Sequence, residues 1–249
     1  MINKIHVASR CRGERWFWCS HNQVWLTQVG VGQTGTMTPL HINTIGSRGA
    51  GSRLLLLLHG YGADEHDLAP LAPYIDPAGD HFTVCPRAPY DVLGGGAGWY
   101  ERDGNGAIVG STFLSSVDAI DATIDTICAA QQLARNEVVI VGFSQGSAMT
   151  LATSLRVGAA QRPAAIACLS GSMQDVAGLD YDFGAADLPH ILVQHGTLDP
   201  VVPIERGRRT RARLIEHNVA HDYAEFEMYH EISAESIGSL QAWLAATID

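Results

Sequence analysis

The stretch VVIVGFSQGSAMTL, residues 138–151, decides how the rest of the chain is interpreted. A short apolar run typical of a buried strand leads into Ser144, which has Gly142 two positions before it and Gly146 two positions after it. Where a strand turns sharply into a helix the two backbones cross closely, so a side chain at either glycine would collide. Ser144 is then expected at the tip of a strained turn, beside the free N–H groups of the helix's first turn. The pattern G-x-S-x-G is typical of a nucleophile elbow.

The chain from Pro39 onward alternates between strand-like and helix-like segments. Apolar runs predict strands within residues 40–45, 53–60, 81–89, 138–142, 164–171, 189–196 and 221–229. Amphipathic or helix-forming runs predict helices within residues 64–75, 113–127, 144–156, 203–218 and 233–248. Strands that alternate with helices predict right-handed crossovers and a mostly parallel sheet with helices on both faces. In such an α/β sheet, ligands bind at the carboxyl ends of the strands.

The amino-acid composition indicates which class of molecule the protein binds. The 249 residues carry a formal net charge of −10 and a sequence pI near 5.5, which weighs against nucleic acid or anionic lipid and favours a neutral small molecule. No apolar run approaches the roughly 20 residues of a membrane span, so we expect no stable membrane insertion and a cytoplasmic location. The odd number of widely spaced cysteines indicates buried free thiols rather than disulfides or a zinc site; they are Cys11, Cys19, Cys85, Cys128 and Cys168.

Residues 1–36 differ from the rest of the chain. They contain Trp16, Trp18 and Trp25 but show no clear hydrophobic period, and charged residues interrupt every candidate signal-peptide core. We therefore expect residues 1–36 to be a poorly ordered extension and residues 37–249 to be the catalytic domain. Met37 is a candidate for the natural start.

A serine nucleophile needs a base held by an acid, and in this fold class the chain order is Ser, then Asp or Glu, then His. Asp199 lies in the loop after the predicted strand 189–196, and His230 lies where the last strand gives way to the last helix. We predict that Asp199 is the acid and His230 the base. Asp175, after the preceding strand, is the alternative acid. Three other histidines are interpreted as structural or surface residues: His195, His217 and His221.

The oxyanion that forms on attack needs two N–H donors. We predict the backbone N–H of Gln145, the residue after the nucleophile, and that of Tyr61, in the loop LLLLLHGYGAD. His59 is interpreted as a structural bracket for this loop. Its acidic and histidine residues lack a recognised metal-ligand spacing, which argues against a metal site; they are His59, Asp64, Glu65 and His66.

Seven ordered motifs together resemble the phospholipase/carboxylesterase family of α/β-hydrolases, relatives of acyl-protein thioesterases. They are LLLHGYGADEHDL, CPRAP, GGAGWYERD, GFSQGSAM, LSGSM, HGTLDPVVP and YHEI, which span about Leu54 to the C-terminus. The resemblance implies an α/β-hydrolase fold, a triad of Ser144, His230 and Asp199, and no cofactor or metal. The loop HGYGADEHDL is more similar to the bacterial carboxylesterase branch, which implies small ester substrates. Tyr229 stands where family members commonly carry glycine.

The expected reaction is two-step acyl transfer through an acyl-enzyme. Trp99 and Met173 are predicted as apolar walls for the acyl group, with core packing as the alternative for each. An acyl-protein thioesterase or a lysophospholipase is the alternative activity, and a binding module that lost catalysis is the alternative class. The sequence does not predict the oligomeric state.

Overall fold

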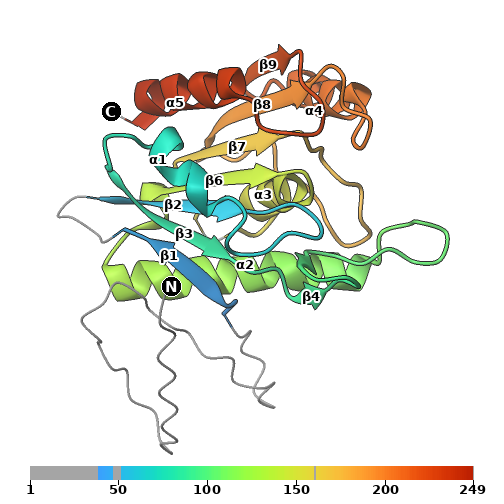
Figure 1. Cartoon of the computed structure of the whole chain (residues 1–249), viewed down its shortest axis with the longest axis horizontal. Helices are drawn as coiled ribbons and strands as arrows, with labels where there is room; N and C mark the ends of the chain where they lie inside the picture. The colour runs from blue at the N-terminus through green and yellow to red at the C-terminus, as the bar shows by residue number, and fades with distance from the viewer. Residues whose placement is uncertain (1–38, 47–51, 160, 249) are drawn as a thin grey trace, which may run out of the picture.

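A seven-stranded, mostly parallel sheet forms the centre of the protein (Figure 1). The computed structural model describes residues 39–46, 52–159 and 161–248, so the extension predicted over residues 1–36 lies outside the described residues. The strands lie in the order β1-β3-β2-β6-β7-β8-β9, and β1 alone runs antiparallel to its neighbour. Their bounds are β1 (Ile42–Ile45), β2 (Arg53–Leu58), β3 (His81–Pro86), β6 (Val138–Phe143), β7 (Ala165–Leu169), β8 (His190–Gly196) and β9 (Asp222–Phe226). The predicted α/β sheet with its opening edge strand is confirmed.

Helices cover both faces of this sheet, as predicted. Helices α1 (Ala72–Ile75) and α5 (Ala234–Ile248) pack on one face. Helices α2 (Gly110–Gln131), α3 (Gln145–Leu155) and α4 (Ile204–Glu216) pack on the other. Short 3₁₀ turns occupy Ala69–Leu71 and Arg135–Glu137. The helix predicted within residues 64–75 is present but short: only Ala69–Ile75 is helical, and Pro70 and Pro73 lack the N–H groups that a longer α-helix requires.

The five leucines of β2 explain how one strand serves two cores. Leu54, Leu56 and Leu58 join the core beneath α2 and α3, and Leu55 and Leu57 join the core beneath α1 and α5. All five are fully buried because successive side chains of a strand point to opposite faces. Burial of each leucine contributes about 1.5–3 kcal/mol. The continuous apolar run is therefore what a central strand requires.

The glycine-rich connection over residues 90–107 contains a short hairpin, β4 (Tyr90–Asp91) and β5 (Ala97–Gly98). Gly96 lies between these strands with a φ of +76°, and a Cβ atom there would come within 1.9 Å of the Gly62 carbonyl oxygen. The hairpin therefore packs directly on the loop that follows β2, and glycine is required at the contact.

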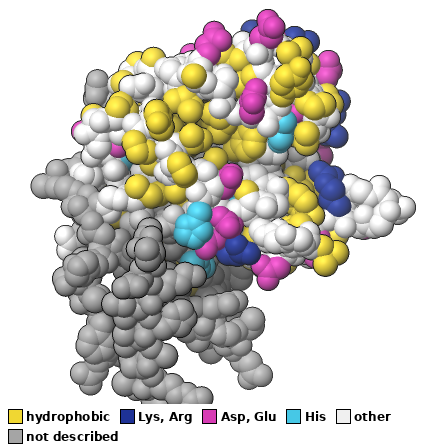
Figure 2. Space-filling model, viewed as in Figure 1, with side chains coloured by type: hydrophobic (Ala, Val, Ile, Leu, Met, Phe, Trp, Pro, Cys, Tyr) yellow, Lys and Arg dark blue, Asp and Glu magenta, His cyan; other side chains and the backbone are white. Residues whose placement is uncertain are grey.

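One broad face of the molecule carries α1 and α5. Figure 2 shows hydrophobic side chains gathered over these helices and, lower on the same face, histidine, acidic and basic side chains side by side. Within the described ranges, no helix combines the length and the apolar character needed to cross a membrane. Strands β6 and β7 point the same way in Figure 1, so the loops that carry the candidate site leave from one edge of the sheet.

Candidate active site

Ser144 lies at the tip of the turn between β6 and α3. Its φ of 55° and ψ of −112° place it in a backbone conformation that residues other than glycine rarely adopt. A Cβ atom at Gly142 would lie 2.3 Å from the Gly146 carbonyl oxygen, and one at Gly146 would lie 2.1 Å from the Leu58 carbonyl oxygen. The close crossing of strand and helix predicted from the sequence is therefore present, and it leaves no space for a side chain at either glycine.

His230 joins Ser144 to Asp199. Its Nε2 lies 2.9 Å from Ser144 Oγ and its Nδ1 lies 2.7 Å from Asp199 Oδ2. The Asp199 side chain is fully buried, and its other oxygen accepts hydrogen bonds from the backbone N–H groups of Val201 and Val202 at 2.9 and 2.8 Å. Because a carboxylate only accepts, Nδ1 of His230 carries the proton and Nε2 is left to accept from the serine hydroxyl.

The other candidate acid and bases have different bonding partners. Asp175 is exposed and forms an ion pair with Arg213 at 2.7 Å. His195 is buried and its Nε2 donates to the Val202 carbonyl oxygen at 2.7 Å, so it braces the loop that holds Asp199. His217 stacks on a phenylalanine ring with centroids 4.3 Å apart. His221 bonds locally to the Val219 carbonyl oxygen through Nδ1 at 2.8 Å.

The loop after β2 lies against the elbow, as its predicted oxyanion role requires. A Cβ atom at Gly60 would lie 3.5 Å from the Ser144 Cβ atom. Tyr61 and Gln145, the two predicted backbone donors, line the same cavity as Ser144. Gln145 begins α3, where the backbone N–H has no partner within the helix and faces a position that favours negative charge.

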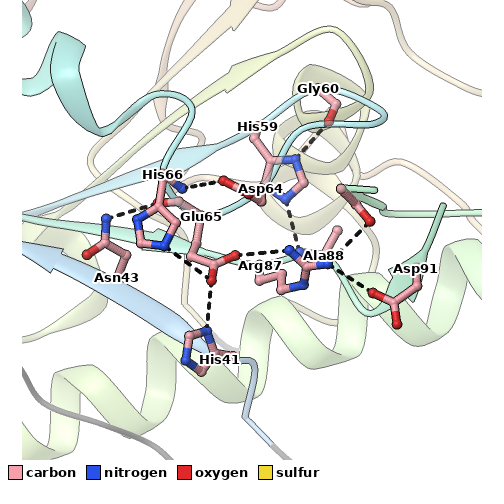
Figure 3. A network of polar contacts seen from close by, with 11 residues as sticks. His41, Asn43, His59, Gly60, Asp64, Glu65, His66, Arg87, Ala88 and Asp91 are labelled. Atoms are coloured by element: carbon pink, nitrogen blue, oxygen red, sulfur yellow. Dashed lines mark hydrogen bonds and ion pairs between the residues drawn. The ribbon is translucent and has the colours of Figure 1, made fainter. Parts of the chain in front are cut away.

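His59 brackets this loop (Figure 3). Its Nε2 accepts a hydrogen bond from the Ala88 N–H at 3.1 Å, so its Nδ1 carries the proton and donates to the Gly60 carbonyl oxygen at 2.7 Å. Burial is the main cause that lowers the pKa of His59, and the neutral ring is the form that these two bonds require. The Trp99 indole N–H donates to the His59 carbonyl oxygen at 2.8 Å.

Glu65 anchors the far side of the same loop. Its carboxylate lies 3.3 Å from Arg87 Nη1, 3.3 Å from His41 Nδ1 and 3.6 Å from His66 Nε2. Figure 3 draws these side chains around Glu65. Arg87 in turn donates to Asp91 at 2.9 Å, which ties the hairpin strand β4 to the network. This cluster therefore braces the loop, and no group of metal-ligating side chains occurs among the residues that the structure describes.

Gln145 has a second role that the sequence reasoning missed. Its side chain accepts from the Trp99 N–H at 2.7 Å and donates to the Tyr100 carbonyl oxygen at 2.9 Å. The predicted acyl wall at Trp99 is wrong, because its side chain is fully buried and its indole N–H is bonded to the His59 carbonyl oxygen, while the Gln145 amide holds the Trp99 backbone. A glutamine directly after the nucleophile was the available signal, since its amide can both donate and accept.

An open cavity of about 750 Å³ lies beside Ser144. Its lining is mixed, with apolar, polar and charged side chains: Tyr61, Tyr90, Asp91, Val92, Leu93, Gly98, Tyr100, Glu101, Arg102, Ser144, Gln145, Gly171, Ser172, Gln174, Val201, Val202, Pro203 and Arg206. Met173 is absent from this lining; it is nearly buried and borders a second cavity of about 270 Å³. The prediction that Met173 walls the site beside Ser144 is therefore wrong.

The arrangement can support nucleophilic attack on a carbonyl group. A hydroxyl, a neutral imidazole and a buried carboxylate form one hydrogen-bonded chain, which is the geometry that activates a serine. The Phe143 ring lies beside the His230 ring with centroids 4.9 Å apart, so it limits where the imidazole can move. The cavity lies at the Ser144 end of this series of hydrogen bonds.

Comparisons with known proteins agree with the α/β-hydrolase fold. The sequence pattern of the phospholipase/carboxylesterase family matches residues 41–248. Acyl-protein thioesterase 1 of Saccharomyces cerevisiae is 29% identical over 203 residues, which cover 74% of this chain and 86% of the yeast protein. The crystal structure of esterase PE8 has a TM-score of 0.72 at 26% identity and covers 84% of this chain and all 100% of that one.

A carboxylesterase from Bacillus cereus shares the fold, with a TM-score of 0.72 at 18% identity over 87% of this chain and 97% of that one. The family match spans the elbow, the loop after β2 and the loops that carry Asp199 and His230. The chain belongs to the phospholipase/carboxylesterase family of α/β-hydrolases.

Proposed function

We propose that the protein is a serine carboxylesterase that hydrolyses small carboxylic esters through an acyl-enzyme. The single observation that carries this proposal is the hydrogen-bonded chain from Asp199 through His230 to Ser144, at the mouth of an open cavity. Membership of a family of ester hydrolases supports the same reaction class.

In the proposed first step, Ser144 Oγ attacks the ester carbonyl carbon while His230 Nε2 takes the hydroxyl proton. The carbonyl oxygen becomes an oxyanion, which the backbone N–H groups of Tyr61 and Gln145 stabilise. His230 then gives the proton to the departing alkoxide oxygen, and the alcohol leaves. Water repeats the sequence on the acyl-enzyme and releases the acid.

Asp199 acts through His230 in this mechanism. Its buried carboxylate fixes the imidazole tautomer and stabilises the imidazolium that forms when the serine proton is transferred. The two valine N–H groups that bind its second oxygen keep the carboxylate in place.

An acyl-protein thioesterase is the second candidate, because the yeast relative carries that name. The rim of the cavity offers apolar side chains, since Tyr61, Leu93 and Val201 are well exposed. The lining also includes the charged and exposed Glu101 and Arg206, which do not suit a long hydrocarbon chain. We therefore propose that short esters are the better substrates.

A fluorophosphonate probe and a series of 4-nitrophenyl esters test the proposal together. We expect the probe to label the wild-type protein and not Ser144→Ala, which should remain folded by circular dichroism and lose ester hydrolysis. Rates in kcat/KM should be highest for short acyl groups. Labelling of Ser144→Ala, or full activity in it, would exclude Ser144 as the nucleophile. A preference for palmitoyl thioesters would favour the second candidate.

A further inference from the structure

Helix α4 is strongly basic although the whole chain has a net charge of −10. Three of its arginines, Arg206, Arg209 and Arg213, are spaced by three and four residues, so they share one face of the helix. All three line the cavity of about 270 Å³. This face therefore presents guanidinium groups to a cavity rather than to a flat surface.

The remaining arginines of α4 have structural partners. Arg208 donates to both oxygens of Glu225 at 2.8 and 2.7 Å, and the Arg211 guanidinium lies 4.8 Å from the centre of the Tyr223 ring. These contacts fix the helix to β9. Of the three cavity arginines, Arg213 also has structural partners: it pairs with Asp175 at 2.7 Å and lies 4.9 Å from the centre of the Tyr181 ring.

The small cavity has an excess of positive charge. Asp175 is its one acidic lining residue, and it pairs with Arg213 at 2.7 Å. Within the described part of the chain, Arg206 and Arg209 form no ion pair, and the other lining residues are neutral: Ser172, Met173, Gln174 and Thr210. Two uncompensated guanidinium groups attract an anion, and their planar forks match the oxygens of a carboxylate or a phosphate.

The two cavities are neighbours, because Ser172, Gln174 and Arg206 line both of them. The charge of Arg206 also acts inside the larger cavity, which Tyr100 lines. Burial raises the pKa of Tyr100, and the positive charges of Arg102 and Arg206 oppose that rise. An ester whose carbonyl lies at Ser144 could therefore extend past these shared residues to the arginines.

We propose that the cavity lined by Arg206, Arg209 and Arg213 is a subsite for an anionic oxygen group, carboxylate or phosphate, on the substrate. The preferred esters then carry such a group at the end remote from the scissile carbonyl. This inference rests on the proposed esterase function and adds a substrate class to it. Binding of the remote anion orients the ester, so its loss lowers kcat/KM.

The test compares anionic with neutral esters in matched pairs. One pair is mono-4-nitrophenyl adipate with 4-nitrophenyl hexanoate, and another is 4-carboxyphenyl butyrate with 4-carbamoylphenyl butyrate. A phosphate arm uses 4-butanoyloxyphenyl phosphate. Uncatalysed hydrolysis is subtracted throughout. We expect the wild-type protein to prefer the anionic member of a pair. Addition of 0.5 M NaCl should reduce that preference, because it shortens the Debye length to roughly 4 Å and screens the arginine charges.

Arg209→Gln is the informative variant, since Arg209 borders the small cavity and not the one beside Ser144. It should lower kcat/KM for the preferred anionic ester by about tenfold, equivalent to roughly 1.4 kcal/mol, and leave the neutral partner unchanged. Arg211→Gln removes the same charge from another face of α4 and should change neither. An Arg209 dependence confined to the carboxylate or the phosphate arm supports the subsite and identifies its anion.

Failure of the subsite and failure of the esterase are distinguishable. Hydrolysis of neutral esters without any anionic preference would overturn the subsite alone, as would equal effects of Arg209→Gln and Arg211→Gln. Loss of all ester hydrolysis in the wild-type protein would overturn the esterase proposal itself. A second measurement needs no variant: adipate or inorganic phosphate should inhibit hydrolysis of the preferred anionic ester competitively at constant ionic strength, and absence of inhibition by both contradicts the subsite.

Discussion

The two carboxylate oxygens of Asp199 make different contacts. Oδ1 accepts from the N–H groups of Val201 and Val202, and Oδ2 accepts from His230. An amide at this position could keep the bonds to the valines through its oxygen, but its NH₂ group would then face the His230 Nδ1–H. The His230 ring would then be held in the wrong tautomer. Asp199 therefore both fixes its own loop and sets the tautomer of His230.

We predict that Asp199→Asn stays folded and lowers kcat on 4-nitrophenyl butyrate by up to about 10⁴-fold, the size of the effect of the equivalent change in a serine protease. Asp175→Asn is the matched control, because Asp175 is exposed and pairs only with Arg213. It should have little effect on the neutral ester. A large loss in Asp175→Asn with little loss in Asp199→Asn would assign the acid to Asp175.

His59 makes the stability of the loop after β2 depend on pH. Its pKa is lowered by burial, so the folded protein disfavours the proton that the unfolded chain binds near pH 6.5. Its stabilising contribution is therefore complete above about pH 6.5 and is lost as the pH falls toward the lower folded-state value. Protonation of Nε2 would also remove the acceptor for the Ala88 N–H.

We predict that His59→Gln is less stable than the wild-type protein at pH 8 and that its stability falls less steeply between pH 6.5 and pH 5. One proton corresponds to a slope of at most about 1.4 kcal/mol per pH unit. Urea unfolding curves of both proteins across this range measure the difference. Parallel pH profiles for the two proteins would show that another group dominates the acid sensitivity.

At the scale of elements, the elbow between β6 and α3 requires glycine, because a side chain there would prevent strand and helix from packing closely. A methyl group at Gly146 would lie 2.1 Å from the carbonyl oxygen of Leu58 in the neighbouring strand β2, which is backbone and cannot give way cheaply. Strand and helix would have to separate, and Ser144 would move with them. The turn is therefore fixed by packing of three elements together.

We predict that Gly146→Ala lowers the free energy of unfolding by several kcal/mol, on the order of 3, or abolishes soluble expression. The control is Gly238→Ala in α5, where a Cβ atom meets nothing within 4 Å. That change should be neutral or stabilise the protein by up to about 1 kcal/mol, because alanine favours helix over glycine. Equal melting temperatures for the two variants would contradict the packing account.

The strand and helix order was predictable from the sequence because apolar runs and helical periods are local properties. The side-chain environments were harder to predict. Trp99 and Met173 were assigned to the acyl site from their position in loops, yet which way a loop side chain points depends on contacts such as the Gln145 clamp, which joins residues 45 and 46 positions apart. The spacing of Arg206, Arg209 and Arg213 on one helix face is visible in the sequence, but the cavity that they border forms only on folding.

The candidate triad was predictable for a different reason. The fold class sets the order of nucleophile, acid and base, and each of Ser144, Asp199 and His230 follows a strand at the carboxyl edge of the sheet. Parallel strands bring those ends together whatever the sequence distance between them, which is 86 residues for Ser144 and His230. Their roles in catalysis stay a proposal until the variants are measured.

At the scale of the whole molecule, the boundary of the catalytic domain remains a prediction. The family match begins at residue 41, and Leu40 is already part of the core, with its N–H bonded to Thr123 Oγ1 at 2.9 Å. A chain that begins at Met37 therefore keeps the contacts that β1 makes with other described residues. Residues 1–36 lie outside both the match and the described residues.

We predict that a chain starting at Met37 is soluble, melts within a few degrees of the full chain and keeps kcat/KM for short esters. Thermal melts and esterase assays on both lengths, run side by side, measure this. Aggregation of the shorter chain, or a loss of about tenfold in kcat/KM, equivalent to roughly 1.4 kcal/mol, would mean that residues 1–36 contribute to the enzyme.

The positive φ of Ser144 lowers the stability of the folded protein at the position that carries the proposed nucleophile. A backbone conformation of this kind costs of order 1–3 kcal/mol for a residue with a Cβ atom and much less for glycine. Ser144→Gly should therefore be inactive and yet melt a few degrees higher than the wild-type protein. Selection for thermal resistance alone would favour glycine at this position, so the proposed role of the hydroxyl accounts for the serine where the stability of the domain does not.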